Sequence, residues 1–451
     1  MSDTKPKTTP DARKIDAMPT KALFIDMLTR DIKLIPSIVD LIDNSVDGAI
    51  RLRGSASFKD LWVRVRISSH ELRIADNCGG IEADLARKYA FRFGREKDAP
   101  WVHHSIGKFG VGMKRAFFKI GRRFRVESQD PTSRFVVDVS VDAWAQDKKK
   151  EWEFKFDTLK EGLKDVSPER LGTIITITQL HRDVADEFKQ QNFQTALKIA
   201  IEAKLQAALS RGLEITLNEI PVGTRHLEML STQKLAPARK TLLFRKLGKP
   251  VTVKLYCGLG ERDRNAAGWH VFCNGRLVLE ADKTDVTCWG PPQVTGIPRF
   301  HPQYHRFRGY AYFDCDDAGR LPWNTTKTGI DTDNRIYRAV RPEMTKLMRP
   351  VITFLNKLKE ERQAFKDEQD KGPLQKLLAK ASPVPFQDLK MRAAFKVPRV
   401  PVREPKVQLQ KIQYEKPLQK VLEVKKALKA RSFREVGEGT FAYFYNNECK
   451  E

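Results

Sequence analysis

The chain has 451 residues, of which 41% are hydrophobic, so it is long enough for two or three domains that each bury a core. Its net charge of +25 and pI near 9.7 favour a polyanionic partner, nucleic acid first and a membrane surface second, over basicity that only aids solubility. No segment approaches the roughly 18 uninterrupted apolar residues of a membrane span, and residues 1–17 are polar. We therefore expect a cytoplasmic protein, either free or nucleoid-associated, with a flexible N-terminal arm and no membrane partner.

The first predicted helix, Thr20–Thr29, follows Pro19 and has a narrow apolar face made of Leu23, Phe24, Met27 and Leu28. A second predicted helix, Ile38–Ala49 (IVDLIDNSVDGA), carries a polar stripe on an otherwise apolar body.

In that second helix, Asp40, Asn44 and Asp47 are spaced by four and three residues and therefore share one face. Because unpaired buried charge costs several kcal/mol, this face requires water, a metal ion or a ligand against it. The alternative is a solvated stripe on a surface helix.

Two glycine clusters follow this helix in the sequence. The alternating segment Leu61–Ile74 predicts a hairpin that turns near Ser69, so Asp76 lies at a strand end, just before Gly79 and Gly80. The second cluster (IGKFGVGMK, residues 106–114) precedes a helical run. Its glycines therefore lie at a helix N-terminus, where free backbone N–H groups bind phosphate.

The ordered set of motifs resembles the GHKL superfamily of gyrase, heat-shock chaperone, histidine kinase and MutL ATPases, and is closest in pattern to bacterial MORC-like and MutL-like proteins. The segment Leu171–Ile177 is similar to that family's Gly-Thr strand, and the resemblance covers about the first 185 residues. It implies an α+β fold: an N-terminal GHKL (Bergerat) α/β sandwich, a transducer-like α/β domain and a basic helical C-terminal region. The predicted boundaries are 1–17, 18–185, 186–345 and 346–451.

The resemblance also implies ATP and Mg²⁺ as cofactors and gives roles to individual residues. Asp76 would accept a hydrogen bond from the adenine amino group, partly through a water that Thr173 also holds, and Asn44 would bind Mg²⁺. The polar segment 82–104 looks like the family's lid over ATP. The implied ATP-binding set is Asn44, Asp47, Asp76, Gly80, Ile81, Gly107, Lys108, Phe109, Gly110, Val111, Gly112, Met113, Lys114 and Thr173.

One position departs from the family pattern in a way that bears on catalysis. The family usually has Glu four residues before the Mg²⁺-binding Asn, as the base that orients or deprotonates water, and here that residue is Asp40. Since aspartate is one methylene shorter, the base is displaced by about 1 Å, which can cost about a hundredfold in rate. We expect slow ATP hydrolysis, with a hydrolysis-dead switch as the alternative. Cys78 also replaces a glycine that is usual in the adenine-side motif.

Strands dominate the next part of the chain, with alternation over residues 123–129, 133–144, 152–159 and 172–180 that predicts an antiparallel sheet. A helix is predicted over Val184–Leu213, followed by a strand over residues 213–218.

The predicted second domain contains strands over residues 251–256 and 309–314 and a hairpin over 269–278 that turns at Asn274 and Gly275. This hairpin resembles the Asn-Gly-Arg hairpin in the transducer domain of MutL and MORC ATPases. Lys327 lies on a polar loop that looks like the transducer loop whose lysine reaches the γ-phosphate, so it joins Asp40 as a candidate catalytic residue. The alternative is a solvated lysine.

Six cysteines occur without CxxC pairs, which indicates reduced thiols: Cys78, Cys257, Cys273, Cys288, Cys315 and Cys449. A zinc site with His270, His301 and His305 is the alternative, although structural zinc ligands normally come in closely spaced pairs.

Basic residues outnumber acidic ones after residue 345. Helices are predicted over residues 344–364, 374–379 and 418–430, with a proline-rich linker over 383–407 and an aromatic tail over 441–445. This region would dock on DNA or dimerise, and its aromatic residues would either stack on single-stranded bases or pack in a core.

We therefore expect an ATPase that dimerises on ATP binding and closes as a clamp on DNA, with an effector protein as a further candidate partner. By analogy with MORC relatives, the process would be defence against foreign DNA. The alternatives are a heat-shock-type chaperone, a type IIB topoisomerase B-like subunit and the hydrolysis-dead switch.

Overall fold

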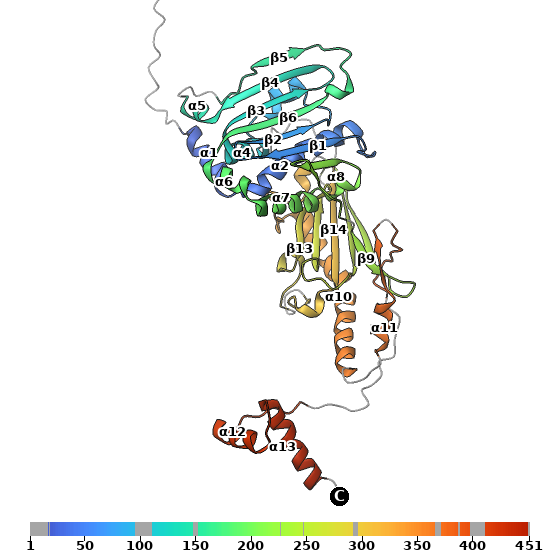
Figure 1. Ribbon diagram of the computed structural model, residues 1–451. Coiled ribbons are helices and arrows are strands. Elements are labelled where there is room, and N and C mark those ends of the chain that lie inside the picture. Colours follow the sequence, from blue (N-terminus) through green and yellow to red (C-terminus); the bar gives the residue numbers. More distant parts are fainter. Residues whose placement is uncertain are drawn as a thin grey trace, which may run out of the picture. The chain divides into compact units, whose positions relative to one another are not determined.

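The computed structural model in Figure 1 describes residues 17, 19–94, 111–147, 152–225, 227–246, 248–291, 296–365, 371–386, 388–396 and 411–449. The chain divides into two compact units, Met1–Val400 and Pro401–Glu451. The first unit contains two large sheets and most of the helices. The architecture is mixed α/β, in agreement with the predicted combination of sheets and helices.

The first sheet has eight strands in the order β5-β4-β3-β6-β2-β1-β7-β8, and all neighbours are antiparallel except β1 and β7. Buried and more exposed residues alternate along its central strands, which places the buried apolar side chains on one face of the sheet. Helices cover this face (Figure 1). The strands are β1 (Trp62–Ile67), β2 (Glu71–Asp76), β3 (Gly121–Gln129), β4 (Ser133–Ser140), β5 (Thr158–Glu161), β6 (Gly172–Leu180), β7 (Glu214–Leu217) and β8 (Ile220–Pro221).

Two of the predicted strands are shorter than their alternation suggests. The strand predicted over residues 133–144 ends at Ser140, because the Ser140 hydroxyl accepts a hydrogen bond from the Ala143 N–H and caps α5 (Val141–Gln146). Of residues 152–159, only the last two belong to a strand, β5. The parallel pairing of β7 with β1 also extends the first sheet beyond residue 185.

The helix α2 (Leu34–Arg53) contains the predicted Ile38–Ala49 helix, and its apolar residues Ile38, Leu41 and Ile42 are completely buried. The helix α1 (Lys21–Arg30) agrees closely with the helix predicted over Thr20–Thr29. The Thr20 hydroxyl caps its N-terminus by accepting a hydrogen bond from the Leu23 N–H. Its apolar face is only partly covered, since Leu23 and Met27 are 52% and 64% exposed.

Short helices lie on either side of the predicted phosphate loop. After β2 come α3 (Ala83–Leu85) and a π-helical turn, Ala86–Ala90, which lie within the described part of the predicted lid, residues 82–94. The helix α4 (Gly112–Ile120) confirms the predicted helical run, and it packs against α2. The predicted loop residues Gly107, Lys108, Phe109 and Gly110 lie outside the described residues.

The helix predicted over 184–213 is three helices, α6 (Arg182–Lys189), α7 (Gln191–Lys204) and α8 (Gln206–Ser210). Its continuity breaks where Gln190 is extended and again at Leu205. Periodicity alone does not register such breaks, because the same apolar face continues across them.

The second sheet has five strands in the order β10-β11-β14-β12-β13. The predicted hairpin is confirmed: β12 and β13 are antiparallel, and Asn274 and Gly275 have φ values of 46° and 78°, as a type I′ turn requires. The strands are β10 (Ala238–Phe244), β11 (Val251–Leu259), β12 (Gly268–Cys273), β13 (Arg276–Asp282) and β14 (Phe307–Cys315).

The long helix α10 (Arg335–Ala364) packs on this second sheet and is followed by α11 (Pro373–Ala379). Part of the predicted proline-rich linker is a strand, because β15 (Ser382–Pro385) pairs with β9 (Glu228–Ser231) in a two-stranded sheet. Such a two-stranded sheet has only edges, where prolines are tolerated. Single 3₁₀ turns lie at Pro168–Arg170, Asp285–Thr287, Pro302–Tyr304 and Ala318–Arg320.

The described part of the second unit, residues 411–449, contains α12 (Leu418–Ala427) and α13 (Phe433–Glu448). The predicted aromatic tail is therefore helical, and its aromatic side chains, including Phe441 and Tyr443, are exposed and are not packed in a core of this unit. None of the described helices is sufficiently long and apolar to cross a membrane.

Candidate functional site

The acidic face of α2 lies in the interior of the first unit. Asp40, Asp43 and Asp47 are buried and Asn44 is half-buried. The Asn44 Nδ2 donates to the Asp40 carbonyl oxygen at 3.3 Å, and this bond does not use Oδ1, the Asn44 atom that would bind a cation. The stripe is therefore not the solvated surface feature that was the alternative.

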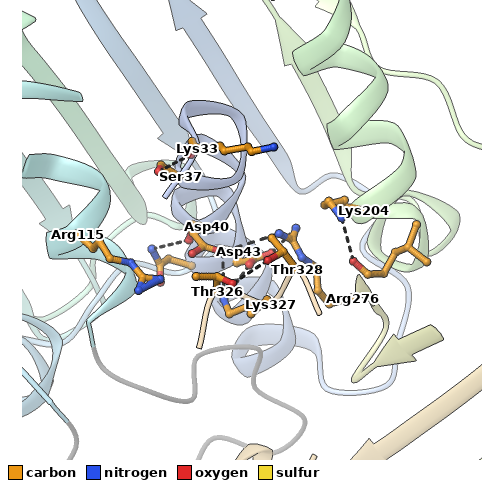
Figure 2. A network of polar contacts seen from close by, with 12 residues as sticks. Lys33, Ser37, Asp40, Asp43, Arg115, Lys204, Arg276, Thr326, Lys327 and Thr328 are labelled. Atoms are coloured by element: carbon orange, nitrogen blue, oxygen red, sulfur yellow. Dashed lines mark hydrogen bonds and ion pairs between the residues drawn. The ribbon is translucent and has the colours of Figure 1, made fainter. Parts of the chain in front are cut away.

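Two cations, Arg276 of β13 and Lys327 of the loop after β14, meet two of these carboxylates (Figure 2). The Lys327 Nζ lies 2.9 Å from Asp43 Oδ2 and 3.6 Å from Asp40 Oδ1. The Arg276 Nη1 lies 3.0 Å from Asp43 Oδ1, and its Nη2 lies 3.8 Å from Asp40 Oδ1. We call Asp40, Asp43, Arg276 and Lys327 the charge cluster, and all four side chains are less than 10% exposed.

Burial and neighbouring charge oppose each other in setting the pKa values of Asp40 and Lys327. Burial raises the pKa of Asp40, against the nearby charge of Lys327, which lowers it. Burial alone would lower the pKa of Lys327, but the charges of Asp40 and Asp43 raise it above its ordinary value. Lys327 is therefore held as a cation.

The loop that carries Lys327 is fixed by its own hydrogen bonds. Asn324 Oδ1 accepts from Thr326 Oγ1 and from the Thr328 N–H, both at 3.0 Å, and the Lys327 N–H donates to the Asn324 carbonyl oxygen at 3.1 Å. Lys327 has φ of 52°, a conformation that costs a lysine of order 1 kcal/mol and persists only where its surroundings impose it. The loop therefore holds Lys327 towards α2 and does not leave it solvated.

The position of Arg276 follows from the hairpin turn. It is the first residue of β13, directly after the turn, and the Asn274 side chain exchanges two hydrogen bonds of 2.9 Å with the Cys315 backbone. Among the described residues, Arg276 Nε has no hydrogen-bond partner, whereas Arg276 Nη1 and the Oδ1 atoms of Asp40 and Asp43 meet only the ion-pair partners given above. Buried polar atoms in this state favour a ligand or water that supplies the missing partner.

The N-terminus of α4 approaches the same carboxylates. A Cβ atom at Gly112 would lie 3.7 Å from Asp40 Oδ2. Arg115 is close enough to lower the pKa of Asp40, and its Nη2 donates to the Thr325 carbonyl oxygen in the Lys327 loop at 3.4 Å. Three elements thus converge on Asp40: α2 itself, α4 and the Lys327 loop.

Lys114 does not join this group. It is almost completely buried, its Nζ donates to the Ala90 carbonyl oxygen at 2.8 Å, and burial lowers its pKa to about 7. Its neighbours Val111 and Met113 lie at the N-terminal end of α4, as the sequence predicts.

A second group of residues surrounds Asp76 at the end of β2. Asp76 Oδ2 accepts from Ser45 Oγ at 2.6 Å, and Oδ1 accepts from the backbone N–H groups of Cys78 at 2.9 Å and Thr173 at 3.2 Å. Burial raises the pKa of Asp76, against these hydrogen bonds, which lower it. Cys78 thus keeps the carboxylate in place although it departs from the family's glycine.

Thr173 and the glycine turn are tied to the neighbouring strands. Thr173 is opposite Asp76 on β6, and its hydroxyl is 2.9 Å from Ser128 Oγ, which accepts from the Ile81 N–H at 2.8 Å. Gly80 has φ of 74°, and a Cβ atom there would lie 2.0 Å from the Gln129 carbonyl oxygen, so only glycine fits. Ser45, which binds Asp76, is adjacent to Asn44, so the two groups form one continuous site along α2.

Residues 32–173 match the family of histidine kinase-, DNA gyrase B- and HSP90-like ATPases. This match supports the GHKL superfamily and an ATP-binding ATPase function for the segment, which contains α2, Asp76 and Thr173. No curated protein gives a significant match to the chain. We refer below to residues 32–173 as the GHKL segment.

Four residues of the site were not selected from the sequence: Asp43, Arg276, Ser45 and Arg115. Asp43 is a further acid on an otherwise apolar helix, a signal that was available. Arg276 follows the predicted turn, but only the fold brings it to α2.

Asp40, Asp43 and Asn44 present oxygen atoms of the kind that Mg²⁺ binds; Asp40 and Asp43 are ion-paired with Arg276 and Lys327, and Asn44 Oδ1 is not used by the bond from Asn44 to the Asp40 carbonyl oxygen. The alternative zinc site does not form: among the described residues, no group of three or more His, Cys, Asp or Glu side chains could hold a metal ion. The cysteines are free thiols, and all are buried except Cys449.

Proposed function

We propose that this chain is a MORC- or MutL-like GHKL ATPase that binds ATP with Mg²⁺, dimerises through its head and closes as a clamp on DNA. The observation that carries the proposal is the contact of Lys327, from the loop after β14, with Asp40 and Asp43 of the GHKL segment. Through this contact, whatever binds at α2 also acts on the second sheet.

In this proposal Asp76 accepts a hydrogen bond from the adenine amino group, and the α4 N-terminus faces the phosphates. Asn44 would hold Mg²⁺, which supplies charge neutralisation at the phosphates. Asp40 orients or deprotonates the attacking water, and hydrolysis is slow because its stem is short.

Closure of the clamp follows from the different ways in which ATP and ADP interact with Lys327. The γ-phosphate of ATP competes with Asp40 and Asp43 for Lys327, whereas ADP has no γ-phosphate to do so. ATP and ADP therefore hold the two sheets together with different strength, and a ligand shifts a conformational equilibrium only by such a difference. DNA is the proposed cargo because of the net charge of +25, and defence against foreign DNA is the proposed process.

Three variants of the full chain test the proposal. ATP turnover should be lost in Asp40→Asn, should fall about tenfold or more in Lys327→Met, and should be unchanged in Lys160→Met, which removes an exposed lysine of β5. Light scattering should show dimers with ATP or a non-hydrolysable analogue and monomers with ADP. Monomers under all conditions would contradict the clamp.

The hydrolysis-dead switch is the second candidate, because Asp40 is both shortened relative to glutamate and placed near two cations. It would bind ATP and dimerise without any turnover. Turnover that is absent in the wild type but appears in Asp40→Glu would favour it over the slow ATPase.

A further inference from the structure

The N-terminal half of α10 carries a dense run of positive charge. Its sequence from Arg335 to Arg349 is RIYRAVRPEMTKLMR, in which Glu343 is the only acidic residue. Its basic residues are Arg335, Arg338, Arg341, Lys346 and Arg349, which we call the α10 basic face.

These five residues lie on one side of the helix. A rotation of about 100° per residue places all of them within an arc of about 140°, and a rise of about 1.5 Å per residue spreads them over about 21 Å. The buried residues of the same turns, such as Tyr337, Val340 and Met344, occupy the opposite side. The α10 basic face is therefore the solvent side of a helix anchored on the second sheet.

The charges of this face are mostly uncompensated. Among the described residues, neither Arg335, Arg338 nor Arg349 forms an ion pair, and Arg341 donates only to the Asp285 carbonyl oxygen, at 2.7 Å. Glu343 is bound by Lys346 and by Lys240 of β10.

Two hollows lie along the face, and the described side chains that line them include no carboxylate. The first, of about 620 Å³, lies between the end of β10 and the start of α10, and its cations are Arg245, Lys246, Arg320 and Arg335. The second, of about 500 Å³, is lined by the other four residues of the α10 basic face. Eight cations thus surround two adjacent depressions.

We propose that the α10 basic face binds the phosphate backbone of double-stranded DNA. This inference rests on the proposed function and specifies where the DNA would be held. A row of guanidinium groups about 21 Å long matches a polyanion with regular spacing, because each duplex strand carries a phosphate about every 3.4 Å.

A duplex fits this surface better than a single strand. Binding of single strands relies on exposed aromatic rings that stack on bases. Of the described residues that line the two hollows, Phe244 alone is aromatic, and it packs partly against the core. Contacts to phosphate alone fix position without reading sequence, so we expect binding that is independent of sequence.

The test is the salt dependence of duplex binding by the full chain, measured by fluorescence anisotropy. Each phosphate contact contributes about −0.9 to the slope of log K against log salt. The triple variant Arg335→Ala, Arg338→Ala, Arg349→Ala should therefore bind more weakly and should flatten the slope by about 2.7.

A matched control removes the same charge from the same helix. Lys357→Ala, Lys359→Ala, Arg362→Ala replaces three exposed cations beyond Arg349, and it should leave most of the slope intact. An equal loss in this control would show that only total charge matters and would overturn the inference, as would equal displacement of the duplex by single strands or by anionic vesicles.

The outcomes also separate this inference from the proposed function. Unchanged duplex binding in the Arg335, Arg338, Arg349 variant would overturn the α10 basic face and leave the clamp in place. No duplex binding by the wild type would overturn both. Loss of duplex binding in the variant, in a protein that shows no ATP turnover, would support the face and contradict the ATPase.

Discussion

The two ends of the site are built from different parts of the chain. Asp76 is held by neutral hydrogen bonds from Ser45, Cys78 and Thr173, all within the GHKL segment. Asp40 and Asp43 are instead met by Arg276 of β13 and by Lys327 of the loop after β14, more than 200 residues later in the sequence. In the proposed function, base recognition is therefore local to the GHKL segment, whereas the phosphate end also depends on Arg276 and Lys327.

This difference separates two kinds of effect. Changes near Asp76 should alter how tightly any adenine nucleotide binds. Changes in the charge cluster should alter what the nucleotide does to the rest of the molecule, because they act on the contact between the two sheets.

The largest effect is expected at Asp43. Asp43→Leu leaves Lys327 and Arg276 buried with only Asp40 as a counter-charge, so the free energy of unfolding should fall by about 3 kcal/mol in urea denaturation. Adding Arg276→Met removes one of the stranded charges and should recover part of that loss. A single variant as stable as the wild type would show that the cluster does not hold the two sheets together.

Asp76→Asn should weaken the binding of ATP and of ADP equally, by about a hundredfold. The substitution replaces a charged acceptor by a neutral amide, and the amide NH2 group is a donor where the carboxylate had an acceptor oxygen. Calorimetry with both nucleotides measures this change. Ser45→Ala, which removes one supporting donor, should have a smaller effect in the same direction. Selective loss of ATP binding alone would mean that Asp76 does not face the base.

Asp40→Glu should raise ATP turnover by tenfold, up to about a hundredfold, because the longer stem restores the reach of the base. Steady-state kinetics would show the change in kcat, with the dissociation constant for ATP nearly constant. If turnover is measurable in the wild type and is the same in Asp40→Glu and Asp40→Asn, position 40 is not the base.

The smallest effect is a pH dependence from Lys114. Its pKa is about 7 in the folded protein and near 10.5 in the unfolded chain, so between these values the unfolded state binds one more proton. Stability should therefore rise with pH in this window, by at most about 1.4 kcal/mol per pH unit. Below about pH 7 both states hold the proton, so Lys114 gives no pH dependence there and its destabilising effect is complete. Thermal midpoints of the wild type and Lys114→Met, compared from neutral to alkaline pH, should converge if Lys114 is the source.

Local patterns predicted much of the fold. The apolar body of α2, the alternation before Asp76 and the Asn274-Gly275 turn each specify a structure within a few residues. The ends of elements were predicted less well: Ser140 ends a strand by capping a helix, and Gln190 interrupts the predicted helix although the apolar face continues across it.

Long-range pairings were not predictable in this way. The sequence of β7 indicates a strand but not its parallel pairing with β1, because the partner lies about 150 residues away. The role of Asp43 was not predictable from the sequence either. Asp43 pairs with Arg276 and Lys327, and only the folded chain brings these two residues to α2.

The most direct measurement is calorimetry of ATP and ADP with the wild type and Lys327→Met. If the γ-phosphate takes Lys327 from the charge cluster, the wild type should bind the two nucleotides with different affinities, and Lys327→Met should abolish most of that difference while ADP binds as before. Two results would contradict coupling of the two sheets through Lys327. One is a Lys327→Met variant whose affinities for ATP and ADP differ as much as those of the wild type. The other is a wild type that binds neither nucleotide.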